Sequence, residues 1–377
     1  MDREPTESHA RVDRIVKNLS PTDETSGLPV SLTSRMEELH VPAVSVAVGF
    51  GDETSWSACF GKLARDEVGA ATPGTLFEIG SVTKMVTAVT ALCLVEREQL
   101  ALDADIHDVL HSWRLPDSAL SSTEKVTLRR LLTHTSGLPS TLFDVEEDGV
   151  PTTAQVLRGE RPAINEPAVL ASIPGTDHAY SNLAYVVIQQ MIEDITGHAF
   201  PAVVREVLLE PLGMTHSTFD PLGEGVSLSE LPRPHDAEGT AHPIAYHPTA
   251  VAQGGMWTTP SELLRLLGEL IGTLNDREMG ILSPAMVDQM VRPQPPLDGS
   301  QYGWTDGQGL GVFLLGRGEQ MRFLHPGLNV PGATGLAIAW PSKRFAVAIA
   351  TNGFNGQTLQ LELLRSISTE YGVDLGL

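Results

Sequence analysis

The chain has 377 residues, of which 41% are hydrophobic and 19% charged, a composition typical of a folded protein with a sizeable core. Its formal net charge is −22, so its surface repels phosphate backbones and anionic lipid, and neither nucleic acid nor a membrane is an expected partner. The polar N-terminus lacks the apolar core of a signal peptide, and no window approaches roughly 18 apolar residues, so we expect a cytoplasmic protein.

The hydrophobic pattern predicts strands near both ends of the chain and helices between them. A strand pair is expected first, and a long helix follows with Ser81 in its N-cap position, because apolar residues then recur at helical spacing. In chain order the predicted strands are 43–49, 54–61, 308–316, 320–325, 333–340 and 345–351. The predicted helices are 12–19, 81–99, 126–133, 182–196, 200–210, 260–272, 283–292 and 356–371.

These elements predict one structural unit over residues 1–377, of the α/β (α+β) class. The two strand groups would form one sheet, with residues 1–75 and 300–377 in an α/β lobe and residues 76–299 in an inserted, mainly helical lobe with loops. A cleft between two such lobes is the natural place for a site. Cys59 and Cys93 lie in apolar stretches without metal-ligand spacing, which predicts buried free thiols and leaves a disulfide open.

The first chemical signal is Ser81-Val82-Thr83-Lys84, in which the serine and the lysine lie on one helix face. A serine hydroxyl needs a nearby base to become a nucleophile, and a lysine can serve when burial lowers its pKa. The chain has five lysines against twenty arginines, and Lys84 lies in an otherwise apolar helix, where it must be desolvated or paired. The bare pattern also fits a capping serine followed by a surface lysine.

The second signal is Tyr180-Ser181-Asn182, just before a predicted helix. Alternate residues of an extended segment face one side, so Tyr180 and Asn182 could point together into a cleft. A tyrosine can act as a general base or acid when a cation lowers its pKa, and Asn182 could hydrogen-bond Lys84 or a substrate amide. The same residues also fit an ordinary helix cap.

The third signal is His325-Pro326-Gly327, at the end of a predicted strand. A glycine there would let a substrate carbonyl approach the backbone, and the N–H of Leu328 could then donate to an oxyanion. The alternative is a strand that ends in a turn, with His325 partly exposed. The motifs G-x-S-x-G and H-E-x-x-H do not occur in the sequence, and neither a metal nor a cofactor is expected.

In this order the three motifs resemble those of the serine β-lactamase and penicillin-binding-protein superfamily, class C-like branch, which includes D-alanyl-D-alanine carboxypeptidases and related esterases. Stretches such as VTLRRLLTHTSGLP and YSNLAYVVIQQMIEDITG are similar to sequences of that branch, and the resemblance covers about residues 40–370. It implies a β-lactamase-like fold, with an antiparallel sheet flanked by helices from both chain ends and an inserted all-helical lobe.

The resemblance also implies a role for each signal. Ser81 resembles the acylated nucleophile, Lys84 its proton acceptor, and Tyr180 the group that relays protons to the leaving group and to the deacylating water. His134, within the first of the two stretches, is interpreted as structural. The groups that would contact the substrate or its oxyanion are Asn182, His325, Gly327 and the backbone N–H groups of Ser81 and Leu328.

The chain departs from this branch where β-lactamases and carboxypeptidases usually have Lys-Thr-Gly, because His325-Pro326-Gly327 stands there. A histidine is mostly neutral at pH 7 and does not offer a permanent positive charge to a substrate carboxylate. We therefore expect hydrolysis of a small-molecule carboxylic ester, or of a related thioester or amide. The alternatives are an acyltransferase that passes the acyl group to an alcohol or amine in secondary metabolism, a β-lactamase or D-amino-acid peptidase, and a non-catalytic acyl sensor.

Overall fold

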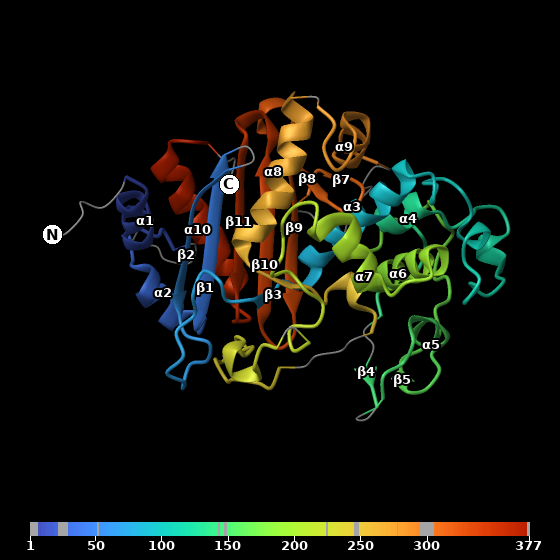
Figure 1. Ribbon diagram of the computed structural model, residues 1–377, viewed down its shortest axis with the longest axis horizontal. Coiled ribbons are helices and arrows are strands. Elements are labelled where there is room, and N and C mark those ends of the chain that lie inside the picture. Colours follow the sequence, from blue (N-terminus) through green and yellow to red (C-terminus); the bar gives the residue numbers. More distant parts are fainter. Residues whose placement is uncertain are drawn as a thin grey trace.

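The computed structural model describes residues 7–21, 29–50, 53–141, 144–146, 149–223, 225–244, 249–276, 278–294 and 305–374. Its central element is a seven-stranded antiparallel sheet in the order β2-β1-β11-β10-β9-β8-β7 (Figure 1). The strands are β1 (Ala43–Phe50), β2 (Glu53–Gly61), β7 (Gly307–Gln308), β8 (Phe313–Leu315), β9 (Arg322–Asn329), β10 (Ala333–Trp340) and β11 (Phe345–Thr351). The first strands of the chain therefore pair with the last, and Val44 of β1 lies opposite Thr351 of β11.

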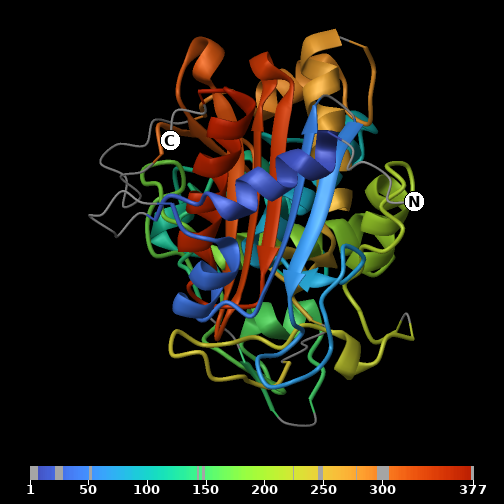
Figure 2. The same cartoon turned by 90° about the vertical axis from the view of Figure 1, so that its left-hand side faces the viewer.

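Helices cover both faces of this sheet. Strands β10 and β11 read ATGLAIAW and FAVAIAT, and each of their residues is buried, as expected for strands packed on both sides. One face carries α1 (Glu7–Lys17), α2 (Leu32–Glu38) and α10 (Gly356–Tyr371), which come from the two ends of the chain (Figure 2). The other face carries α8 (Pro260–Asp276), which packs against β1, β2, β10 and β11.

The remaining helices form a second region beside the sheet, around α3 (Thr83–Glu96) (Figure 1). Every residue of α3 from Thr83 to Leu94 is buried, because this helix is surrounded by other elements rather than lying on the surface. The other helices are α4 (Leu128–Leu132), α5 (Thr153–Arg158), α6 (Asn182–Thr196), α7 (Phe200–Val204) and α9 (Pro284–Met290). The short strand pairs are β3 (Phe77–Glu78) with β6 (Trp257–Thr258), and β4 (Asp144–Val145) with β5 (Ala163–Ile164).

The predicted fold class is confirmed, and several elements have the predicted bounds: helices 182–196 and 356–371, and strands 333–340 and 345–351. The single strand predicted over 308–316 is wrong, because the chain turns between β7 and β8. Gly311 has φ of 77° there, and a Cβ at this position would lie 2.2 Å from the Cβ of Ala88 on α3. The apolar pattern continues through this turn because the turn packs against a buried helix.

The division into 1–75 with 300–377 and into 76–299 stays a prediction, although α8, from the middle stretch, covers the sheet. Both cysteines are free thiols, with Cys93 buried and Cys59 half-buried. Among the residues that the structure describes, none of the helices has the length and apolar character needed to cross a bilayer.

Candidate active site

Ser81 lies in the one-turn 3-10 helix η1 (Gly80–Val82) that leads into α3. It is not the N-cap of α3, as the sequence predicted, because that position is Val82. Gly80 adopts φ of 52°, and Thr83 Oγ1 donates a hydrogen bond of 2.7 Å to the Gly80 carbonyl, which fixes the tight turn. A Cβ at Gly80 would lie 2.8 Å from the backbone nitrogen of Leu328, so the turn carrying Ser81 lies directly against β9.

Lys84 is 0% exposed, and its amine contacts three oxygen atoms. Lys84 Nζ lies 3.0 Å from Ser81 Oγ, 2.8 Å from Asn182 Oδ1 and 2.6 Å from the Gln253 carbonyl oxygen. Burial holds the pKa of Lys84 well below its usual value. A neutral amine has two N–H donors and one lone pair. With its donors on Asn182 and Gln253, its lone pair faces the Ser81 hydroxyl and can accept the proton of that hydroxyl.

Tyr180 and Asn182 reach the same place from the segment before α6. The Lys84 ammonium nitrogen lies 4.8 Å from the centre of the Tyr180 ring, and Tyr180 lines the same pocket as Ser81. Ser181 between them points elsewhere, because its Oγ accepts from the backbone N–H of Ala184 at 3.0 Å and caps α6. The alternation expected for this segment therefore brings the tyrosine and the asparagine toward Lys84, while the serine stabilises the helix start.

His134 holds the two residues that flank Tyr180. The backbone N–H of Ala179 donates to the His134 carbonyl at 2.8 Å, and the backbone N–H of Ser181 donates to His134 Nδ1 at 3.1 Å. The His134 and Tyr180 rings lie 4.4 Å apart between centroids. Burial, and next the charge of Lys84, hold the pKa of His134 well below its usual value, so its ring is neutral. Sequence analysis treated His134 as structural and did not find this relation to Tyr180.

His325, Pro326 and Gly327 lie inside β9 rather than at the end of a strand, which corrects the prediction. His325 is 1% exposed and therefore not the partly exposed turn residue of the alternative interpretation. Its Nδ1–H donates to the Pro326 carbonyl at 2.7 Å. Burial, followed by the nearby charge of Lys84, lowers the pKa of His325 to about 3, so this histidine is neutral at pH 7.

Gly327 is required for the contact between β9 and the turn of Ser81. A Cβ at Gly327 would lie 2.0 Å from the Ile79 carbonyl oxygen and 3.0 Å from the backbone nitrogen of Ser81. The strand continues to Leu328, which lines the pocket with Ser81. The backbones that carry the two expected oxyanion donors are therefore neighbours, as a site for a developing negative charge requires.

These groups surround a pocket of about 310 Å³. It is lined by Ser81, Tyr180, Asn182, Phe313, His325, Pro326, Gly327, Leu328 and Gln357. Sequence analysis did not find Phe313, from β8, or Gln357, from the first turn of α10, because no local motif marks them. The lining side chains carry no lysine or arginine, although the Lys84 amine lies beneath the pocket, in contact with Ser81.

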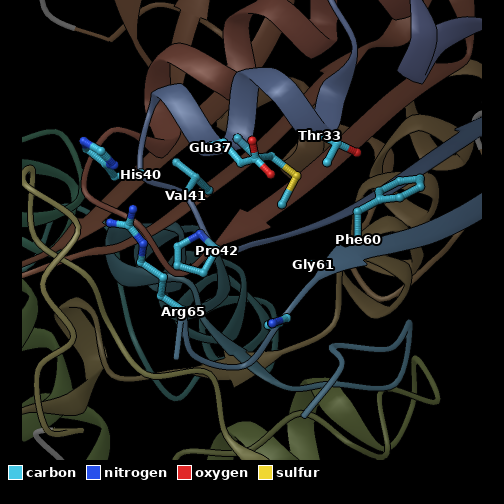
Figure 3. A pocket seen from close by; sticks show the side chains of 10 residues that line it. Thr33, Glu37, His40, Val41, Pro42, Phe60, Gly61 and Arg65 are labelled. Carbon is cyan, nitrogen blue, oxygen red and sulfur yellow. The ribbon is translucent and has the colours of Figure 1, made fainter. Parts of the chain in front are cut away.

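A larger pocket, of about 480 Å³, lies between α2 and the end of β2 (Figure 3). Figure 3 shows Arg65 extending past Pro42 toward His40, with Phe60 at the other side. The hydroxyl among its lining residues, Thr33, and its lysine, Lys62, are both exposed. Neither group is activated by burial as Lys84 is beside Ser81, so we place the chemistry in the smaller pocket.

A buried lysine against a serine hydroxyl, beside two close backbone segments and a tyrosine, defines a serine-nucleophile site on a β-lactamase-like fold. The comparisons agree: the Beta-lactamase family model matches residues 31–367, and the chain belongs to this family. It is 30% identical over 185 residues to penicillin-binding protein 4 of Amycolatopsis lactamdurans, covering 48% of this chain and 45% of that protein. The match thus spans less than half the length of that relative.

Solved structures show the same fold. The octameric penicillin-binding protein homologue from Pyrococcus abyssi superimposes with a TM-score of 0.73 at 24% identity, over 91% of this chain and 76% of the other. The D-amino acid amidase from Ochrobactrum anthropi superimposes with a TM-score of 0.70 at 22% identity, over 97% and 100% of the two chains. At such identities the likeness supports the fold, and function must be argued from the site.

Proposed function

We propose that this protein is a serine hydrolase that forms an acyl-enzyme on Ser81 and acts on uncharged small-molecule carboxylic esters, or on related thioesters and amides. The observation that carries the proposal is the neutral, buried His325 in the strand beside Ser81. Members of the class C-like branch usually have a lysine there, and its charge binds a substrate carboxylate. Here the acyl pocket lacks that charge, which favours a substrate without a carboxylate.

In the proposed reaction, neutral Lys84 accepts the proton of Ser81 Oγ as the oxygen attacks the substrate carbonyl carbon. The carbonyl oxygen becomes an oxyanion, and the backbone N–H groups of Ser81 and Leu328 stabilise it. Tyr180 relays the proton from Lys84 to the leaving alcohol, thiol or amine, whose bond to the carbonyl carbon then breaks. Water enters, gives a proton back along the same path and releases the carboxylic acid from Ser81. Asn182 contacts Lys84 and the substrate.

The rival functions make separable predictions. An acyltransferase would pass the acyl group from Ser81 to an alcohol or amine instead of water. A β-lactamase or D-amino-acid peptidase would need a cation for the substrate carboxylate, and among the described lining residues we find neither lysine nor arginine. A sensor would keep the acyl group on Ser81 without turnover. We expect the cytoplasmic placement predicted from the sequence, where a small-molecule acyl donor is available.

The test is turnover of p-nitrophenyl butyrate by the wild type and by Ser81→Ala, with and without a primary amine or alcohol. Ser342→Ala is the matched control, because Ser342 is an exposed serine that donates to the Glu319 carbonyl. Hydrolysis should disappear with Ser81→Ala, persist with Ser342→Ala and be unaffected by the acceptor. Faster release with a new ester or amide product would identify a transferase. Unchanged turnover by Ser81→Ala would refute the mechanism.

Turnover of a chromogenic cephalosporin measures the remaining alternative. We expect much slower cleavage of this anionic substrate than of the neutral ester. A preference for the cephalosporin would contradict the argument from His325. Mass spectrometry of the intact protein separates the sensor, since a stoichiometric, long-lived acyl adduct without turnover is expected for it alone.

A further inference from the structure

One side-chain amide connects the three backbone segments that build the site. Asn329 Nδ2 donates to Glu78 Oε1 at 2.5 Å and to the Gly254 carbonyl oxygen at 3.0 Å. Asn329 directly follows Leu328 in β9, and Glu78 ends β3, three residues before Ser81. The third segment is the turn after η6 (Val251–Gln253), and it carries the acceptor of the Lys84 amine.

The acceptors of this amide match its chemistry. An asparagine amide nitrogen has two N–H groups, and here one goes to a carboxylate and the other to a backbone carbonyl. The segments approach closely because glycines leave room. A Cβ at Gly80 would lie 3.3 Å from the backbone nitrogen of Asn329, and a Cβ at Gly254 would lie 3.3 Å from Asn329 Oδ1. The bridge therefore spans a gap that larger residues would hold open.

We propose that Asn329, held by Glu78, is a positioning residue that sets the distance between the two oxyanion donors and the position of Lys84. The inference rests on the proposed acyl-enzyme function and adds to it. The bond to Glu78 ties β9 to the segment that leads into Ser81. The bond to Gly254 ties β9 to the residue next to Gln253, whose carbonyl accepts from Lys84 at 2.6 Å. Loss of the amide would let Leu328 and Lys84 move relative to Ser81.

The charge of Glu78 adds a dependence on pH. Burial raises the pKa of Glu78 to about 7, while the hydrogen bond from Asn329 opposes that rise. Strands β6, β10 and β11, which pack against β3, contain no ionisable residue in their sequences WT, ATGLAIAW and FAVAIAT, and η6 contains none in VAQ. The ionisable groups of β9 are Arg322 and His325.

The sign follows from the strength of the bond. Above the pKa of Glu78 the carboxylate accepts a charge-assisted hydrogen bond from Asn329, and below it the neutral acid accepts a weaker one. The bridge is thus strongest above pH 7 and weakens as the pH falls. Acylation of Ser81 should therefore decline on the acid side with a midpoint near the pKa of Glu78.

The experiment measures the rate of acylation, kcat and KM with p-nitrophenyl butyrate from about pH 5.5 to 8.5. The variants are Asn329→Ala and Glu78→Gln. The matched control is Asn275→Ala, because Asn275 Nδ2 also donates to two carbonyls, those of Ile271 and Pro341, at the other end of β10. Thermal unfolding of each variant shows whether a lost rate reflects lost folding.

Asn329→Ala should lower the acylation rate about 10- to 100-fold with little change in KM, because misplacement by about 1 Å costs roughly that much. It should also move the acid limb to higher pH, since the bond that holds down the pKa of Glu78 is gone. Glu78→Gln keeps an acceptor for Asn329, so it should retain activity at pH 8 and lose the limb. Asn275→Ala should match the wild type.

Two results would overturn the inference. One is Asn329→Ala with an acylation rate within twofold of the wild type, and the other is an acid limb that stays in place in both variants. If Asn329→Ala does not fold, the pH profile of Glu78→Gln decides alone. Wild-type protein that is not acylated on Ser81 would instead refute the proposed function, so the two failures are distinguishable.

Discussion

Replacement of His134 by alanine tests whether Tyr180 is held in place from behind. The change removes Nδ1, which accepts from the Ser181 N–H, and the ring that packs 4.4 Å from the Tyr180 ring. It leaves the bond from Ala179 to the backbone carbonyl of His134. Tyr180 would then be fixed on one side only, and both its ring and the residue after it would be free to shift.

The magnitude follows from these contacts. Ser181 is fully buried, so its N–H would lose an acceptor at a cost of about 1–3 kcal/mol in the free energy of unfolding. If Tyr180 moves by about 1 Å, the catalytic rate should fall roughly 100-fold. His134→Asn should recover part of both losses, because an asparagine oxygen can accept from the same N–H.

The assay is kcat and KM with the neutral ester, together with urea unfolding of the wild type, His134→Ala and His134→Asn. His134 is neutral in the folded state because its pKa is held down, so its contribution to stability is present above the ordinary histidine pKa of about 6.5. This contribution should be lost as the pH falls below that value, and the alanine variant should lack that loss. A kcat of His134→Ala equal to the wild-type kcat would refute the reasoning.

Three further outcomes are expected. Lys84→Met should lower kcat about 10²- to 10⁴-fold with the thermal transition retained, because the proton acceptor is lost. Gly327→Ala should lower kcat roughly 100-fold or more, since its methyl group would lie 2.0 Å from the Ile79 carbonyl; circular dichroism checks the fold. Glu362→Gln should cost about 3–5 kcal/mol in urea unfolding, because Glu362 pairs with a fully buried arginine at 2.9 Å. Wild-type values in any of these would contradict the corresponding contact.

The sequence predicted the parts of the site that are local in the chain. Ser81 and Lys84 lie one turn apart, so spacing alone brings them together, and the structure has their polar atoms 3.0 Å apart. Tyr180 and Asn182 likewise follow from an extended segment before a helix. The central strands were predicted with their bounds because buried strands read as continuous apolar runs.

The remaining parts depend on contacts between distant residues. Ser81 lies in a 3-10 turn rather than at a helix cap because Gly80 must fit against Leu328, and no local pattern shows that. The bond between His134 and Ser181 joins residues 47 apart, and the bond between Asn329 and Glu78 joins residues 251 apart. Histidine and asparagine are common in loops, so their types alone do not reveal such roles.

The pairing of β1 with β11 means that the first strands find their partner only after most of the chain exists. Ser81 and Leu328, which flank the proposed oxyanion hole, are separated by 328 − 81 = 247 positions. At roughly 5–20 residues per second, a ribosome needs about 12–50 s to add that length. During this interval a nascent chain carries Ser81 and Lys84 without β9 or β10 beside them. The nucleophile is therefore synthesised early but is assembled only at the end of translation.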